Sequence, residues 1–175
     1  MKRALLISGM LGLMLMLGCW KKAESGPSAP GWSGFNPDNG KFTVAMPGTP
    51  TETPLGTNGK MWTSSSDGMT YSVSYQELQL PPGTSDTDQA EQQLDAEEET
   101  YLTLQEGKHT GDRKPLIVGG VPGREVDIDI DGKTIRRVRM ALAGNRLYMI
   151  EVSGPKDKVN AADTDAFLDS FRVGK

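Results

Sequence analysis

The side chain with the clearest chemistry is the thiol of Cys19, the only cysteine among the 175 residues of the chain. A thiolate is a nucleophile and a metal ligand, and a lone cysteine cannot form an internal disulfide. A largely apolar run over residues 4–17 precedes this thiol, after two basic residues and before Gly18. A charged start, a short apolar stretch and a small residue together make a secretory signal, so the sequence predicts a signal peptide over residues 1–18.

The sequence around this thiol resembles the lipobox of bacterial lipoproteins. Residues 15–19 read Leu-Met-Leu-Gly-Cys, with Met16 where the motif favours leucine. The resemblance implies that Cys19 is acylated, for example with palmitate, and that the acyl chains anchor the protein to a membrane on the exported side of a bacterial cell envelope. Trp20 at the next position, in place of aspartate, slightly favours the outer membrane over the inner one. The alternative is an ordinary secreted protein with an incidental thiol.

The remaining chain divides by composition into a tether and a domain. Residues 19–40 are rich in Pro, Gly, Ser and Asn and have no hydrophobic period, which predicts a flexible, lipid-anchored tether. Trp32 and Phe35 leave open the alternative that the end of this segment fastens onto the domain. Residues 41–175 are numerous enough to bury a core of their own, so we expect a single domain there.

The chain is acidic and lacks the common catalytic motifs. Its formal net charge of −4 disfavours general binding to nucleic acids, because such binding depends on basic patches. His109, the only histidine, lies in a segment typical of a solvated loop, so neither a zinc cluster nor a Ser-His-Asp triad is expected. We therefore expect a protein that is not an enzyme and has no cofactor and no metal. The alternative is an envelope hydrolase whose carboxylates the sequence does not reveal.

One acidic motif matches part of a calcium site. Asp127, Asp129, Asp131 and Gly132 match the first half of an EF-hand loop, but the twelfth position is Val138 instead of the glutamate that completes such a site. The flanking residues alternate as strands, whereas that motif requires helices. The motif is therefore interpreted as a β-hairpin with a three-residue loop and a glycine bulge, which places acids and bases of the two strands on one face.

Two charged clusters each have two interpretations. Arg136, Arg137 and Arg139 would form a partner surface if they were free to bind an anionic ligand, but the acids on the neighbouring strand make internal ion pairs the favoured interpretation. Residues 97–99 are three consecutive glutamates. Consecutive residues of a helix point in different directions, so we expect a solvated helix face there and not a metal site.

Hydrophobic periodicity predicts strands, one helix, four more strands and a final helix. Residues 69–76 alternate as a strand, and because Leu78 and Leu80 fall on the opposite parity, we expect a bulge near Gln76. Residues 146–153 are apolar on both parities, which predicts a central strand covered on both faces. The other expected elements are strands over 42–46, 60–65, 116–118, 124–130 and 133–143 and helices over 86–106 and 161–172.

This order of elements argues for the α+β class, with a mostly antiparallel sheet. The strand Phe42–Met46 followed by Pro-Gly-Thr-Pro, together with the late segments Arg146–Tyr148 and Phe167–Phe171, resembles the PsbP-like α/β/α-sandwich proteins. The resemblance implies a twisted sheet with helices on both faces, in a class of binding and assembly factors that are often lipoproteins and share no catalytic residues. We therefore expect a lipid-anchored cell-envelope protein with a non-catalytic binding or assembly domain, whose partner is another envelope protein or component.

Overall fold

The structure is a computed structural model that describes residues 31–80, 87–105, 108–110 and 114–174. The predicted signal peptide, Cys19 and the first part of the predicted tether lie outside the described residues. Neither of the helices within these ranges has the length and apolarity needed to cross a bilayer.

The described chain alternates runs of strands with two helices. Five strands precede the first helix, five more lie between the two helices, and a two-residue strand follows the second helix. The strands are β1 Ser33–Phe35, β2 Phe42–Met46, β3 Thr51–Leu55, β4 Gly59–Ser66, β5 Met69–Glu77, β6 Lys108–His109, β7 Lys114–Val118, β8 Val121–Asp129, β9 Thr134–Ala143, β10 Arg146–Pro155 and β11 Arg172–Val173, and the helices are α1 Thr87–Gln105 and α2 Ala162–Ser170.

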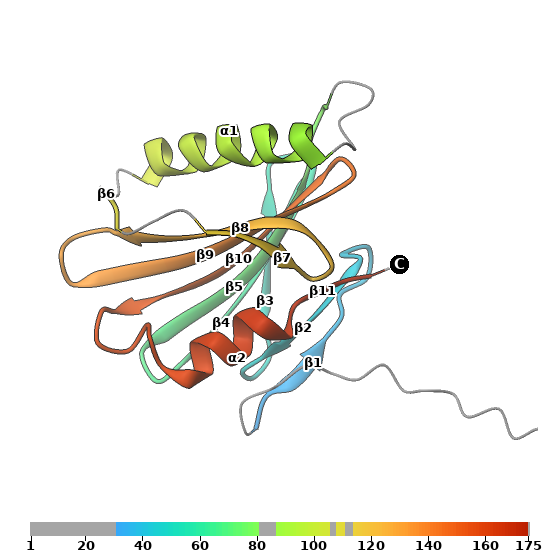
Figure 1. The fold of residues 1–175 in the computed structure, drawn as a ribbon. Coiled ribbons are helices and arrows are strands. Elements are labelled where there is room, and N and C mark those ends of the chain that lie inside the picture. Colours follow the sequence, from blue (N-terminus) through green and yellow to red (C-terminus); the bar gives the residue numbers. More distant parts are fainter. Residues whose placement is uncertain (1–30, 81–86, 106–107, 111–113, 175) are drawn as a thin grey trace, which may run out of the picture.

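A large antiparallel sheet forms the centre of the fold (Figure 1). Its strands follow the order β3-β4-β5-β10-β9-β8-β6, and β7 also pairs with β8. Helix α1 packs over β8 and β9 on one face, whereas α2 and a small sheet of order β1-β2-β11 pack on the other face. This arrangement confirms the predicted α+β class, with helices on both faces of a mostly antiparallel sheet.

Two hydrophobic cores lie on the two faces of the large sheet. The core on the α2 side is rich in aromatic rings, and its fully buried side chains include Phe42, Tyr148, Phe167 and Phe171. The core under α1 is smaller and holds Ala90, Leu94, Val126, Ile128, Val138, Met140, Leu142 and Leu147. Among the described residues, α1 contributes the buried side chains of Ala90 and Leu94 to this core, and its partly buried Tyr101 and Leu102 pack against it.

The central position predicted for residues 146–153 is confirmed. β10 pairs with β5 along one edge and with β9 along the other. Tyr148 and Ile150 belong to the aromatic core, while Leu147 and Met149 pack in the core under α1. The even-numbered and the odd-numbered residues of β10 are both apolar because each set packs in one of the two cores.

The bulge predicted near Gln76 is wrong. β5 keeps one continuous register with β10 from Thr70 to Glu77. The even-numbered residues of β5 point to the α1 face of the sheet, and Leu78 and Leu80 continue on that parity to pack against the core under α1. The two leucines therefore pack in the other core from the odd-numbered residues of β5, and no inserted residue is needed to place them there.

A strand that was not predicted precedes β2 in the described chain. β1 lies within the segment expected to be tether, and it pairs with β2. The ring of Trp32 lies 4.8 Å from that of Tyr71, and the ring of Phe35 lies 5.9 Å from that of Trp62. Of the two alternatives for this segment, the structure shows the one in which its end fastens onto the domain. Packing of two aromatic rings offsets the conformational entropy lost when this Gly-rich and Pro-rich segment is ordered.

The acidic motif of β8 forms a hairpin with β9, as predicted. Asp127 lies opposite Arg137, so acids and bases share one face. In the loop, Asp131 accepts a hydrogen bond from the backbone N–H of Thr134 at 2.6 Å. This bond and a second one from the backbone N–H of Lys133 lower the pKa of Asp131. The carboxylate therefore caps its own loop.

Two further strands, of two residues each, were not predicted. His109, expected in a solvated loop, belongs to β6 and pairs with Ile128 of β8. β11 pairs with β2 in the small sheet. A strand of two residues carries no periodic pattern, so only its partner strand reveals it.

Candidate functional site

The three arginines of β9 do not form one surface. Arg137 and Arg139 contact acidic residues of α2, whereas Arg136 contacts Tyr101 of α1. Successive residues of a strand point to opposite faces of the sheet, so the odd and even positions separate. The partner surface considered from the sequence is therefore split into two clusters on opposite faces.

On the α2 face, Arg137 and Arg139 are held in a network of ion pairs. Arg137 Nε lies 2.7 Å from Asp127 Oδ1, and Arg139 Nε lies 2.8 Å from Glu125 Oε2. Arg139 Nη1 also lies 2.6 Å from Asp169 Oδ1 of α2. The hydrogen bond that Arg137 donates to Asp127 raises the pKa of Arg137. Burial lowers the pKa of Arg139, but the hydrogen bonds that it donates to Asp169 and Glu125 outweigh this effect and raise its pKa. Internal pairing is the interpretation that the structure supports for both side chains.

On the α1 face, Arg136 joins a largely buried cluster with Tyr101 and Glu151. Arg136 Nε lies 3.0 Å from Glu151 Oε1, and Tyr101 Oη donates a hydrogen bond to Glu151 Oε2 at 2.6 Å. Burial and the adjacent carboxylate raise the pKa of Tyr101 far above its usual range. The phenol therefore stays protonated and acts as a hydrogen-bond donor that ties α1 to β10.

A second polar anchor under α1 corrects an expectation from the sequence. Glu98, expected on a solvated face, has an exposed fraction of 0%. Its Oε2 lies 3.2 Å from Nη1 of Arg124 of β8, and the same nitrogen contacts Asp95. A helix turns by about 100° per residue, so the middle one of the three glutamates faces the sheet while Glu99 is exposed.

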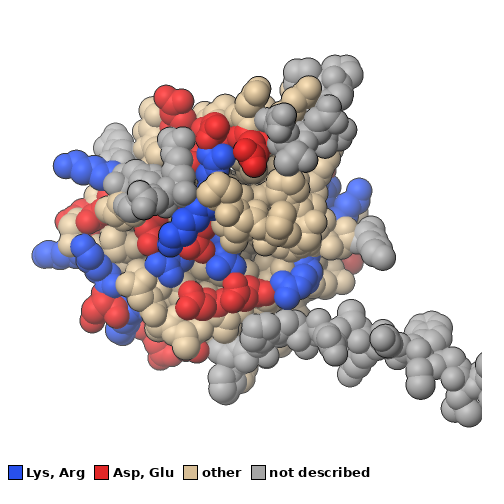
Figure 2. All heavy atoms as spheres, viewed as in Figure 1, with Lys and Arg blue, Asp and Glu red and all other residues tan. Residues whose placement is uncertain are grey.

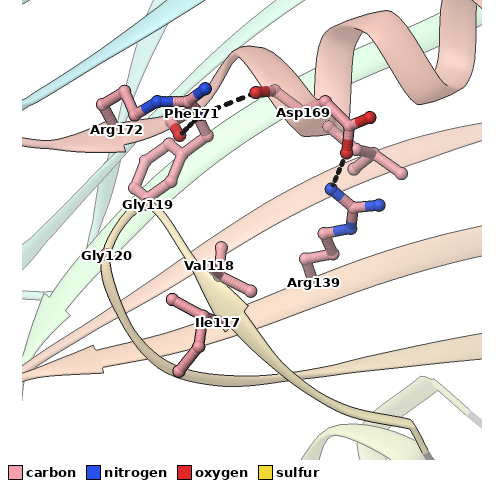
Figure 3. A pocket seen from close by; sticks show the side chains of 9 residues that line it. Ile117, Val118, Gly119, Gly120, Arg139, Asp169, Phe171 and Arg172 are labelled. Atoms are coloured by element: carbon pink, nitrogen blue, oxygen red, sulfur yellow. Dashed lines mark hydrogen bonds and ion pairs between the residues drawn. The ribbon is translucent and has the colours of Figure 1, made fainter.

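An open cleft of about 430 Å³ lies at the C-terminal end of α2, beside the turn between β7 and β8. Figure 3 shows the β7 side chains and the turn on one side and the end of α2 with the start of β11 on the other. We call this concavity the Arg172 cleft. Its lining residues are Ile117, Val118, Gly119, Gly120, Arg139, Leu168, Asp169, Phe171 and Arg172.

The turn that forms one wall of the Arg172 cleft is fixed in place. Gly119 and Gly120 have φ values of 61° and 98°, as the favoured two-residue hairpin turn requires. A Cβ atom at Gly119 would lie 2.9 Å from the ring of Phe171, and the Gly119 carbonyl accepts a hydrogen bond from the Val173 N–H at 3.2 Å. Only glycine allows this close approach of the turn to the end of α2, so the wall is preformed.

Arg172 and Ile117 give the cleft its binding chemistry. Arg172 Nη1 donates to the carbonyl oxygens of Asp169 and Phe171, each at 2.6 Å, which fixes the exposed guanidinium at the end of α2. Within the described residues, Nε and Nη2 of Arg172 have no hydrogen-bond partner. Ile117, with an exposed fraction of 70%, lines the same cleft. A guanidinium with free donors near an exposed apolar side chain fits a carboxylate that is flanked by apolar surface.

The Arg172 cleft has one acidic side chain in its lining. Asp169 is the single carboxylate among its lining residues, and it is paired with Arg139. Across the ranges that the structure describes, no group of three or more His, Cys, Asp or Glu side chains is placed to hold a metal ion. Of the lining residues, the sequence singled out Arg139 alone as a candidate. The other residues come together only in three dimensions.

Comparisons with known proteins bear on the fold. No family model and no curated protein sequence matches the chain. Among solved structures, the chain is similar to cyanobacterial PsbP (CyanoP) from Synechocystis sp. PCC 6803, with a TM-score of 0.58 and 10% sequence identity, over 83% of this chain and 94% of that one.

Two further solved structures are less similar. A Bacteroides thetaiotaomicron protein has a TM-score of 0.48 and 12% identity over 77% of this chain and 46% of its own. A Pseudomonas aeruginosa protein of unknown function has a TM-score of 0.41 and 8% identity over 73% of this chain and 85% of its own. At 10% identity, the likeness to CyanoP concerns the backbone alone. On the architecture and this likeness together, the chain has a PsbP-like α+β fold.

Proposed function

We propose that the chain is a lipid-anchored protein of the bacterial cell envelope whose domain binds another envelope protein without catalysing a reaction. The anchor is the acyl group on Cys19, and the binding site is the Arg172 cleft. The observation that carries the proposal is the preformed cleft in which Arg172 offers free donors beside the exposed side chain of Ile117. The surface it fits is a partner segment in which a carboxylate follows or precedes an apolar residue.

Three ion pairs support binding over the alternative of a carboxylate hydrolase. Glu125, Asp127 and Glu151 each lie within 3.0 Å of an arginine nitrogen. Each of these carboxylates is engaged by an arginine of the neighbouring strand β9, so its oxygens already take part in contacts between strands. These three side chains are therefore better suited to holding the sheet and helices together.

The charge distribution supports a protein partner over a nucleic acid. Figure 2 shows Lys and Arg side chains interspersed with Asp and Glu over the visible face, with acidic side chains along α1 at the top of the view. A chain with a net charge of −4 and this mixed surface repels a polyanion more than it attracts one. A single carboxylate at Arg172 meets no such general repulsion.

A site-specific photo-crosslinker tests the cleft in living cells. With a benzophenone side chain in place of Ile117, we expect one discrete crosslinked adduct, and Arg172→Glu is expected to reduce its yield at least tenfold because a carboxylate would then face a carboxylate. The same crosslinker in place of Leu104 is the matched control, because Leu104 is equally exposed, at 73%, and lies on α1. Unchanged circular dichroism of Arg172→Glu excludes unfolding as the cause.

The proposal is wrong if the adduct at position 117 persists in full in the Arg172→Glu variant, or if positions 117 and 104 give the same adducts. Either result would mean that crosslinking at position 117 reports exposure of the side chain and not specific binding in the Arg172 cleft. Release of a small product from an envelope substrate by the purified chain would favour the hydrolase instead.

The anchor is tested separately through Cys19. Because the acyl chains are attached to this thiol, Cys19→Ser is expected to leave the precursor uncleaved or to move the protein into the soluble fraction. Membrane fractionation and mass spectrometry of the N-terminus measure both outcomes. Membrane association and processing that match the unmodified chain would contradict the lipid anchor.

A further inference from the structure

A second concavity lies at the edge of the large sheet formed by β3, where the chain leaves β2. Its volume is about 380 Å³, and we call it the threonine hollow. Six of its eight lining residues carry hydroxyl groups and none is charged; the residues are Pro47, Gly48, Thr49, Thr51, Thr53, Thr63, Ser64 and Ser65. The Arg172 cleft, in contrast, adjoins β7 at the other edge of the sheet and contains three charged residues.

The strands place the hydroxyl groups in two adjacent rows. Thr51 of β3 lies opposite Thr63 of β4, and Thr53 lies two residues further along β3 on the same face as Thr51. Neighbouring strands are about 4.8 Å apart, and residues on one face of a strand are about 7 Å apart. A ligand of the size of one ring can therefore reach hydroxyl groups of both strands at once.

Ser64 lines the hollow without offering its hydroxyl group to it. Ser64 lies between Thr63 and Ser65 on β4 and opposite Tyr71 of β5, so its side chain points to the face of the aromatic core. Its Oγ is buried. The hydroxyl groups that Thr51 and Thr53 of β3 and Thr63 of β4 place on the other face are therefore the ones that a ligand can use.

The chemistry of this lining selects a neutral ligand that is rich in hydroxyl groups. Serine and threonine hydroxyls both donate and accept hydrogen bonds, as do those of a sugar. A charged ligand would lose hydration without meeting an opposite charge, and an apolar ligand would leave the hydroxyl groups of the wall without hydrogen bonds. We infer that the threonine hollow binds a neutral saccharide chain.

This site is independent of the proposed protein partner. The hollow and the Arg172 cleft have no lining residue in common, and they lie at opposite edges of the large sheet. Substitutions at Thr51 or Thr63 therefore leave crosslinking through position 117 unchanged, and Arg172→Glu leaves saccharide binding unchanged. Failure of one proposal is thus distinguishable from failure of the other.

Nuclear magnetic resonance titration of the purified full-length chain tests the inference. The probes are three neutral tetrasaccharides, namely maltotetraose, cellotetraose and tetra-N-acetylchitotetraose, and the acidic tetragalacturonate is the charged comparison. With at least one neutral probe we expect saturable shifts of the backbone amide signals of Thr51, Thr53 and Thr63. Tetragalacturonate is expected to bind at least tenfold more weakly, because its carboxylates meet no cation in the hollow.

The double variant Thr51→Val, Thr63→Val removes two hydroxyl groups while keeping the β-branched shape. We expect it to weaken binding of the neutral probe at least tenfold, whereas Thr43→Val, at an exposed position of β2 outside the hollow, leaves binding unchanged. An undisturbed amide spectrum elsewhere shows that the double variant is folded. Absence of saturable shifts with all three neutral probes, or equal binding by the unmodified chain and the double variant, would overturn the inference.

Discussion

Replacing Arg124 by methionine is expected to lower the free energy of unfolding by about 3–5 kcal/mol. Arg124 is buried between β8 and α1, where its Nη1 lies 3.2 Å from Oε2 of Glu98 and also contacts Asp95. Glu98 is fully buried, so the variant leaves a carboxylate under the helix without this guanidinium. Urea denaturation of the purified chain, analysed by linear extrapolation, measures the change.

A double variant separates the loss of the ion pair from the loss of packing. Arg124→Met combined with Glu98→Leu removes both charges, and replacing a buried ion pair by apolar side chains is often neutral or stabilising. We therefore expect the double variant to recover most of the stability lost by Arg124→Met alone. Glu99→Ala, at the exposed neighbouring position, is the matched control and should change the free energy of unfolding by less than about 0.5 kcal/mol.

Two results would contradict this account of α1. If Glu98→Ala and Glu99→Ala had equal small effects, the middle glutamate would be solvated, as the sequence alone suggested. If the double variant were less stable than Arg124→Met, the two charges would not be coupled.

The second large effect is expected for Phe42→Ala, which should lower the free energy of unfolding by about 3–5 kcal/mol. The ring of Phe42 is buried, with its centroid 5.6 Å from that of Trp62, 5.7 Å from that of Phe171 and 6.0 Å from that of Tyr148. These rings come from β4, the end of α2 and β10. Truncation removes a contact between the small sheet and the large sheet and leaves a cavity that rigid neighbours do not fill.

Graded variants at the same site check that the effect comes from packing. Phe42→Leu keeps part of the side-chain volume, so we expect a smaller loss than for Phe42→Ala. Ile117→Ala removes a large apolar side chain at an exposed position and should change the free energy of unfolding by less than about 0.5 kcal/mol. Comparable losses for Phe42→Ala and Ile117→Ala, measured by urea denaturation, would mean that the aromatic core does not hold the two sheets together.

Local periodicity was sufficient to predict the class of fold and its central strand. The alternation of β5, the two apolar parities of β10 and the opposed charges of β8 and β9 are all written in short stretches of sequence. They could be predicted because a strand shows one parity to each face, and the type of residue on each parity reports what that face meets. The same reasoning failed at Leu78. Its apolar side chain packs in the core under α1, and the change of parity was mistaken for an inserted residue in β5.

The sequence by itself determined the longer strands, the two helices and how β8 and β9 match their charges. Only the tertiary structure decided that Glu98 is buried while Glu99 is exposed, that Arg136 meets Tyr101 and Glu151, and that Ile117 and Arg172 line one cleft. The physical reason is distance along the chain. Secondary structure follows from neighbouring residues, whereas burial and sites depend on segments that are far apart in sequence and meet only when the helices pack on the sheet.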